Sequence, residues 1–139
     1  MNEIEKLLPH RDPFLFVDEI VEATNEKIIA KRKFTESEYF FKGHFPEYPV
    51  VPGVILVETM AQSGGAGLRK MGVLGDDALF FFATVDKVKF RRQVLPGDEV
   101  RCEVENLRVS PKMIKQRGKA YVGDEVAAEA EWMCLVGSK

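Results

Sequence analysis

One carboxylate stands alone in a long apolar stretch of this chain. Glu58 is the only charged residue between Tyr48 and Leu68, and the helix-entry signal Pro52-Gly53 precedes it. The apolar residues of this stretch would occupy almost the whole circumference of a helix, which is typical of a buried helix. A carboxylate on a buried helix must be paired, neutralised or used, because an unpaired buried charge is costly. The pattern therefore marks Glu58 as a candidate acid or base.

Two neighbours could complete acid–base chemistry at Glu58. Gln62 follows on the same helix face and can hold the carboxyl group in place. His44 lies just upstream, in the segment GHFP at 43–46, and is the one histidine near this helix. A neutral His44 can act as a base near pH 7, while burial would favour the protonated form of Glu58, which can then act as an acid. The structural alternatives are a hydrogen-bond hub at Glu58 and a solvated loop residue at His44.

The start of the helix offers a site for developing negative charge. Backbone N–H groups at a helix N-terminus favour negative charge, and the missing side chain of Gly53 lets a carbonyl group approach. A base, an acid and such a site together suit acid–base chemistry next to a carbonyl group. Cys102 and Cys134 match no metal or disulfide framework, so we expect two small apolar residues in a reducing compartment.

The composition indicates one globular domain over residues 1–139. Hydrophobic residues make up 45% of the chain and charged residues 30%, as in folded domains. The net charge of −2 gives no indication of nucleic acid or an anionic membrane as a partner. The N-terminus carries acidic residues and no long apolar run, so no signal peptide is expected. The polar residues and glycines within 50–68 argue against a membrane span, and the expected location is the cytoplasm.

The order of the predicted elements indicates an α+β fold. A short helix is expected over 3–8, an ordered loop over 35–51 and a long helix over about 53–71. Strands are expected over 15–23, 27–34, 79–90, 99–109, 113–122 and 125–136. Short turns between consecutive strands predict an antiparallel sheet, and six strands with one apolar helix predict a sheet curled around that helix. Three glycines near the helix end, at 64, 65 and 67, indicate close approach to the sheet or an early end.

Three segments carry a resemblance to a known family. They are LPHRDPFLFVDEI (8–20), GHFPEYPVVPGVILVETMAQ (43–62) and FRRQVLPGDEV (90–100). The chain resembles the beta-hydroxyacyl-[acyl-carrier-protein] dehydratases of the FabZ type, which have the hot-dog fold. The related FabA-type dehydratase-isomerases are longer and carry Asp where this chain has Glu58, so the resemblance favours a dehydratase without the isomerase step. It implies a hydro-lyase that converts (3R)-3-hydroxyacyl-[acyl-carrier-protein] to the trans-2-enoyl form in type II fatty acid biosynthesis, without a metal or other cofactor.

The same resemblance implies roles for individual residues and an assembly. His44 and Glu58 would be catalytic, Gly53 would bind the substrate carbonyl and Gln62 would orient Glu58. The chain would form a homodimer, with His44 and Glu58 of one site supplied by different subunits. Dimers would group into a trimer of dimers.

A basic segment indicates where an acidic carrier protein could dock. Lys87, Lys89 and Arg91 alternate along the predicted strand over 79–90, so they would share one face, with Arg92 beside them. The partner implied by the resemblance is acyl carrier protein carrying a 3-hydroxyacyl chain, which is strongly acidic and would be attracted by such a face. An ordinary solvated strand face explains the same spacing.

The remaining features leave alternatives open. The aromatic run at 80–82 is expected to pack in the core, or else to line an acyl tunnel. His10-Arg11 is expected to form a structural turn rather than a catalytic site. Two rival functions are a hot-dog thioesterase, which would need a carboxylate and water, and a non-catalytic acyl-binding or assembly module, which would not need both His44 and Glu58.

Overall fold

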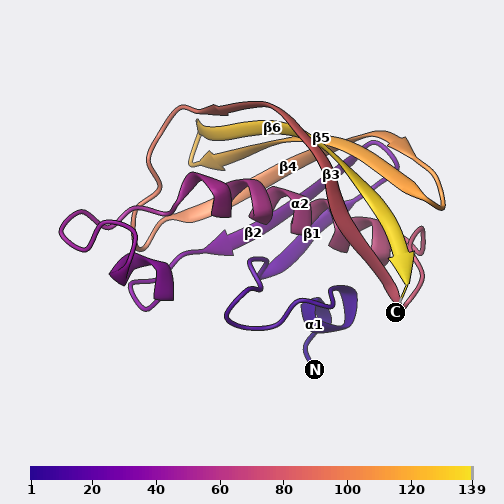
Figure 1. Ribbon diagram of the computed structural model, residues 1–139, viewed down its shortest axis with the longest axis horizontal. Coiled ribbons are helices and arrows are strands. Elements are labelled where there is room, and N and C mark those ends of the chain that lie inside the picture. The colour runs from indigo at the N-terminus through magenta and orange to yellow at the C-terminus, as the bar shows by residue number, and fades with distance from the viewer. Residues whose placement is uncertain (139) are drawn as a thin grey trace.

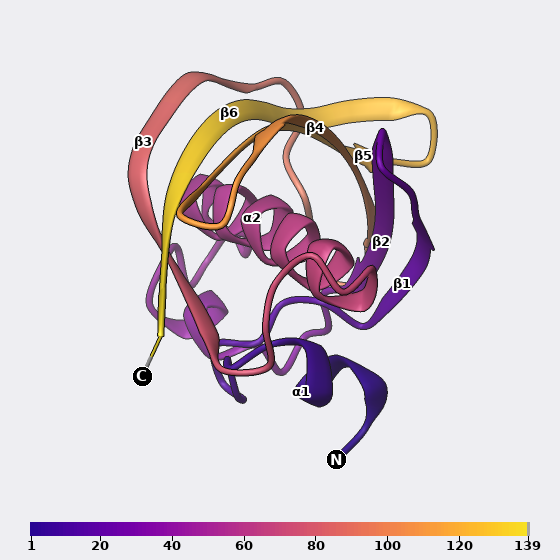
Figure 2. The same cartoon turned by 90° about the vertical axis from the view of Figure 1, so that its right-hand side faces the viewer.

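The computed structural model describes residues 1–138 as one long helix enclosed by an antiparallel sheet (Figure 1). The helices are α1 (Glu3–Leu7), the 3-10 helix η1 (Tyr39–Lys42) and α2 (Gly53–Lys70). The strands are β1 (Glu19–Ala23), β2 (Lys27–Lys33), β3 (Ala78–Phe90), β4 (Glu99–Val109), β5 (Met113–Val122) and β6 (Glu125–Ser138). They form a six-stranded sheet in the order β1-β2-β4-β5-β6-β3. Figure 2 shows the sheet curving around α2, which confirms the predicted hot-dog fold in the α+β class.

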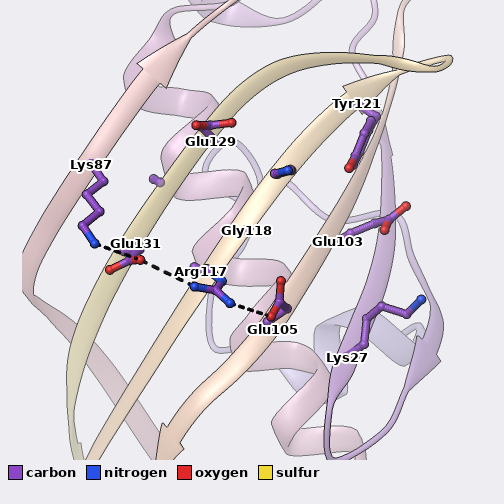
Figure 3. Close-up of a pocket in the computed structure, with 11 residues that line it drawn as sticks. Lys27, Lys87, Glu103, Glu105, Arg117, Gly118, Tyr121, Glu129 and Glu131 are labelled. Atoms are coloured by element: carbon purple, nitrogen blue, oxygen red, sulfur yellow. Dashed lines mark hydrogen bonds and ion pairs between the residues drawn. The ribbon is translucent and has the colours of Figure 1, made fainter.

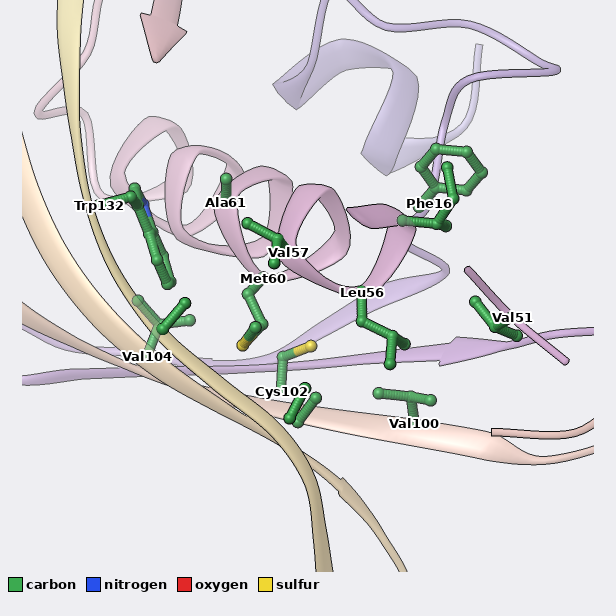
Figure 4. Packing of buried hydrophobic residues seen from close by; sticks show 14 of the residues in the cluster. Phe16, Val51, Leu56, Val57, Met60, Ala61, Val100, Cys102, Val104 and Trp132 are labelled. Carbon is green, nitrogen blue, oxygen red and sulfur yellow. The ribbon is translucent and has the colours of Figure 1, made fainter. Parts of the chain in front are cut away.

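The core lies between α2 and the concave face of the sheet. Leu56 and Met60 of α2 face Val100 and Cys102 of β4, and Trp132 of β6 closes the far side (Figure 4). Burying each large apolar side chain contributes about 1.5–3 kcal/mol relative to leaving it exposed. The strands that face α2 alternate buried and exposed residues, as expected for a sheet with one covered face. This packing fixes the rotation of α2 about its axis and so fixes where Glu58 points.

The glycines late in α2 allow close contact with its surroundings. An added Cβ would collide with a neighbouring side chain at three of them: Gly64 with Gln116, Gly65 with Phe80 and Gly67 with Ile28. The helix continues beyond them to Lys70, with Met71 as its C-cap, one residue short of the expected end. Of the two alternatives, close approach to the sheet or an early end of the helix, the first is therefore correct. Within the described residues no helix, α2 included, is long and apolar enough to cross a membrane.

The first strand is shorter than the sequence pattern predicts. β1 begins at Glu19 instead of at residue 15. Phe16 and Val17, which precede it, are buried in the hydrophobic core. Their apolar character comes from packing against the helix and not from a place in the sheet. The segment that contains them crosses α2 close to Glu58.

Strand β3 forms an exposed edge of the sheet. It pairs with β6 on one side and has no strand on the other within residues 1–138. Phe80 is partly buried against the core, but Phe81 is 58% exposed and Phe82 is 42% exposed. The expected core packing is therefore wrong for Phe81 and Phe82. An aromatic edge strand of this kind is a surface that proteins usually cover.

Candidate active site

His44 lies in an ordered loop that fixes which of its ring nitrogens is basic. The backbone N–H of His44 donates to the carbonyl of Phe40 at 2.8 Å, and Phe40 is buried in the core. The ring Nδ1 lies 3.1 Å from the carbonyl oxygen of Val50. Because a carbonyl oxygen can only accept, Nδ1 must carry the hydrogen and donate it. Nε2 is left with a free lone pair, as a general base requires.

His44 and Gly53 line the same cleft, which has a volume of about 450 Å³. Gly53 is the first residue of α2, and its N-cap, Pro52, provides no side-chain cap. The N–H of Ile55 donates to the carbonyl of Pro52 at 2.9 Å, whereas the N–H groups of Gly53 and Val54 have no hydrogen-bond partner within residues 1–138 and remain available to a ligand. A Cβ added to Gly53 would lie 2.7 Å from the ring of Phe90, which also lines the cleft. Glycine therefore lets an aromatic ring lie against the helix start, next to the basic histidine.

Glu58 lies on α2 with its carboxylate held by Gln62. The Gln62 amide donates from Nε2 to Oε2 of Glu58 at 3.0 Å and to the carbonyl oxygen of Phe14 at 3.0 Å. Its Oε1 accepts from the backbone N–H of Phe16 at 2.8 Å. Gln62 is fully buried. The Glu58 side chain is 19% exposed, so it is less buried than the sequence pattern predicts. The geometry is that of an oriented carboxyl group reachable from one side, and the orienting role of Gln62 stays a prediction.

The structure brings His10 to Glu58, which sequence reasoning missed. Arg11 does hold a turn here, since it donates to the carbonyls of Leu8 and His10. The same turn places His10 Nε2 at 3.7 Å from Glu58 Oε2 and packs the ring against Phe80, with centroids 5.8 Å apart. Burial lowers the pKa of His10, although the charge of Glu58 opposes this and that of Arg11 adds to it. One signal in the sequence could have found His10: it lies in the segment 8–20, which is one of the three segments that carry the family resemblance.

One chain keeps the two halves of the candidate site apart. Among residues 1–138 no hydrogen bond or ion pair joins His44 to Glu58, and Glu58 does not line the cleft that holds His44 and Gly53. Five helical residues turn the chain by about 140° about the helix axis, so Gly53 and Glu58 face different directions. The structure thus pairs His44 with Gly53, and Glu58 with Gln62 and His10.

The basic segment on β3 is less regular than its spacing predicts. A bulge interrupts the pairing between Asp86 and Lys89, and Lys87 has a left-handed backbone with φ of 52°. Most of the expected docking cations are also paired with acidic residues, as Figure 3 shows for Lys87: the pairs are Lys87 with Glu131 at 3.6 Å, Arg91 with Glu129 at 3.2 Å, and Arg92 with Asp98 and Glu125, both at 3.6 Å. Lys89 forms no ion pair in the part of the chain described. The outer face of the sheet therefore carries mixed charges instead of an even basic stripe.

The two cysteines are free and buried, as expected. Burial raises the pKa of both Cys102 and Cys134 to about 12, so both thiols are protonated at neutral pH. Residues 1–138 contain no group of three or more His, Cys, Asp or Glu side chains that could hold a metal ion. The cysteines thus belong to the core.

Comparison with known proteins identifies the family. Residues 8–131 match the FabA-like domain. Full-length relatives named 3-hydroxyacyl-[acyl-carrier-protein] dehydratase FabZ include one from Desulforamulus reducens, 46% identical over 100% of this chain and 98% of the relative, and one from Clostridium perfringens, 45% identical over 99% and 98%. The dehydratase heterocomplex ApeI:P from Xenorhabdus doucetiae shares the fold, with a TM-score of 0.83 at 17% identity, covering 100% of this chain and 93% of that one. The chain therefore belongs to the FabA-like family and, within it, to the FabZ type.

Proposed function

We propose that the protein is a (3R)-3-hydroxyacyl-[acyl-carrier-protein] dehydratase, a hydro-lyase of fatty acid biosynthesis that forms the trans-2-enoyl thioester. Family membership and the full-length FabZ relatives support this activity. The observation that supports it in the structure is the cleft that both His44 and Gly53 line, because a histidine and the free N–H at the start of α2 then belong to one site. Proton removal next to a thioester carbonyl needs both.

Each group has one task in the elimination. The thioester oxygen accepts a hydrogen bond from the N–H of Gly53, which stabilises the charge that develops on it. His44 Nε2 removes the C2 proton, and the electrons of that C–H bond form the C2=C3 double bond as the C3–O bond breaks. Glu58 donates its proton to the departing hydroxyl group, which leaves as water. Proton loss from His44 and proton gain by Glu58 return the site to its starting state.

We place the Glu58 of each site on a second copy of the chain. The exposed edge of β3 offers backbone groups for pairing with the same strand of another copy. Phe81, Phe82 and the 73% exposed Val54 at the start of α2 would be covered in such an assembly. A two-fold axis would create two equivalent sites, each with His44 from one copy and Glu58 from the other. A trimer of such dimers is the further expectation from the family resemblance.

The substrate would arrive on acyl carrier protein. Lys87, Lys89, Arg91 and Arg92 are the proposed docking residues, and they lie near the end of β3 that leads to Phe90 and the cleft. Lys89 is the strongest candidate of the four because no ion pair within the described chain occupies its ammonium group. The others would exchange an internal acidic partner for one on the carrier, which reduces their net contribution.

An assay with 3-hydroxybutyryl and crotonyl thioesters tests the proposed activity. We expect the enoyl absorbance to rise with the first substrate and fall with the second, without release of free thiol. Glu58→Gln serves as the matched control, because it keeps the shape of the side chain and removes the acid. Thiol release would instead indicate a thioesterase, and no reaction with either substrate would indicate a non-catalytic acyl-binding module.

A further inference from the structure

His10 is enclosed in a way that leaves only one of its ring nitrogens with a polar neighbour. Nδ1 is buried and has no hydrogen-bond partner among residues 1–138. Nε2 points toward Glu58 Oε2 at 3.7 Å, and the ring lies against Phe80 of β3. A buried polar atom that lacks a partner costs free energy, so this arrangement calls for an explanation.

The surroundings determine the protonation state of the ring. A charged imidazole would need a second N–H on Nδ1, which would be a buried donor without an acceptor. Burial also lowers the pKa of His10, against the opposing influence of Glu58 and with the support of Arg11. A neutral ring carries one hydrogen, and only at Nε2 does that hydrogen face an acceptor. His10 is therefore a neutral imidazole with its N–H directed at Glu58.

Gln62 and His10 both face the same carboxyl oxygen of Glu58. Gln62 Nε2 donates to Oε2 at 3.0 Å, and His10 Nε2 faces that oxygen too. An oxygen that accepts two N–H groups is a poor place for the acid proton. We propose that His10 is a positioning residue that donates to Oε2 of Glu58, so that Oε1 carries the proton given to the departing hydroxyl group. The inference rests on the proposed function, in which Glu58 is the acid.

The neutral state of His10 suits this task. A cation at this position would hold Glu58 ionised and unable to give a proton. A neutral donor leaves the acid form intact and stabilises the negative charge that appears on Glu58 as the proton departs. The groups facing this pair are Phe80 from β3, Arg11 from the same turn and Cys134 from β6, which the charge of Glu58 reaches. The distance of 3.7 Å is long for a hydrogen bond, and catalytic contacts commonly tighten when substrate binds.

Two substitutions at residue 10 separate positioning from packing. His10→Phe keeps the aromatic contact with Phe80 and removes the donor, whereas His10→Gln loses the ring and keeps an N–H near the place of Nε2. If His10 positions Glu58, kcat falls about tenfold in the Phe variant, the scale of losing one hydrogen bond to a charged group, with KM nearly unchanged, and the Gln variant stays close to wild type. The opposite order, with Phe active and Gln impaired, would overturn the proposal.

A spectroscopic readout covers the case in which the Gln variant does not fold. In wild-type protein with 15N-labelled histidine, we expect the signals of a neutral His10 ring protonated at Nε2 to dominate at pH 6.5, the ordinary pKa of a histidine, because burial lowers the pKa of His10. Signals of the other neutral form, or of a mostly charged His10 ring at that pH, would contradict the proposal. Glu58→Gln separates the two claims: an active Glu58→Gln enzyme refutes the proposed acid, while an inactive one beside a fully active His10→Phe enzyme refutes only the role of His10.

Discussion

The two halves of the candidate site are held in different ways. Glu58 projects from the middle of α2, whose packing against the sheet fixes it, and Gln62 ties it to the segment that contains Phe14 and Phe16. His44 lies on a loop outside the sheet, where one ring hydrogen bond to the carbonyl of Val50 sets its orientation. The Glu58 half is thus anchored by the buried Gln62 of α2, whereas the His44 half lies on a surface loop.

This difference indicates what each half needs. The proposed acid, Glu58, must present one oxygen in a fixed direction, and three hydrogen bonds of Gln62, one buried and two partly buried, provide that. In the proposed shared site, His44 must stay accessible until the second chain arrives. Phe45, Tyr48 and Val54 near His44 are exposed, as expected of a surface that a partner covers. In the proposed site, Glu58 would therefore come from a packed helix and His44 from a surface loop.

The largest expected effects come from removing the acid or the base. His44→Ala and Glu58→Gln should each lower kcat by about a hundredfold or more, the scale of losing a general acid or base. Both variants should keep the melting temperature near that of wild type, because neither residue is a member of the hydrophobic core. Near-full dehydratase activity in either folded variant would contradict the assignment of that residue.

The next largest effect is expected from Gly53→Ala, which changes the cleft that His44 lines. The added Cβ would lie 2.7 Å from the Phe90 ring, and this exposed ring can swing away at little cost to the fold. The displaced ring would then crowd the thioester at the helix start, and we expect kcat/KM to fall about tenfold. Gly53→Ala with Phe90→Leu is the matched control, because it removes the ring. Unchanged kcat/KM in Gly53→Ala would mean that the carbonyl binds elsewhere.

Sequence patterns predicted the helix, the strands and contacts between residues close in sequence better than contacts between residues far apart in sequence. Period and turn signals predicted the helix, the strands and their wrapping, because one apolar helix has few ways to be covered. Glu58 and Gln62 were found as a pair because helix spacing is local. The contact between His10 and Glu58 was missed because the two residues are 48 positions apart in the sequence and only the tertiary fold brings them together. The bulge at Lys87 was missed because strict alternation assumes a regular strand.

Gln62→Leu should weaken the Glu58 half in two ways at once. The backbone N–H of Phe16 and the carbonyl of Phe14 would lose their partner, which lowers the free energy of unfolding by about 2 kcal/mol or more. The Glu58 carboxyl group would lose its fixed direction, so kcat should also fall about tenfold.

Gln116→Leu is the matched control for Gln62→Leu, since Gln116 is equally buried and bonds to Asn106 and Trp132 away from Glu58. Chemical denaturation and kinetics on both variants should show two destabilised proteins, of which only the Gln62 variant has a lower kcat. Equal kcat in the two would show that Gln62 supports the fold and not the acid.

The smallest expected effect concerns carrier docking. Lys89→Glu should raise KM several-fold for substrates on acyl carrier protein and leave small thioester substrates unaffected, because only the former need an attractive surface. Added salt should reduce the difference between wild type and variant, since exposed charges are screened. Lys115→Glu, an exposed lysine on β5, is the control. Equal losses on both substrate types would mean that the carrier docks elsewhere.

Subunit mixing tests most directly whether the two halves meet across a subunit interface. Inactive His44→Ala and inactive Glu58→Gln chains are unfolded together, refolded together and assayed with 3-hydroxybutyryl thioester. A mixed dimer contains one intact site and one doubly substituted site, so random pairing predicts recovery of about a quarter of wild-type activity. If mass spectrometry shows mixed dimers and activity stays at the level of the separate variants, the shared site is contradicted.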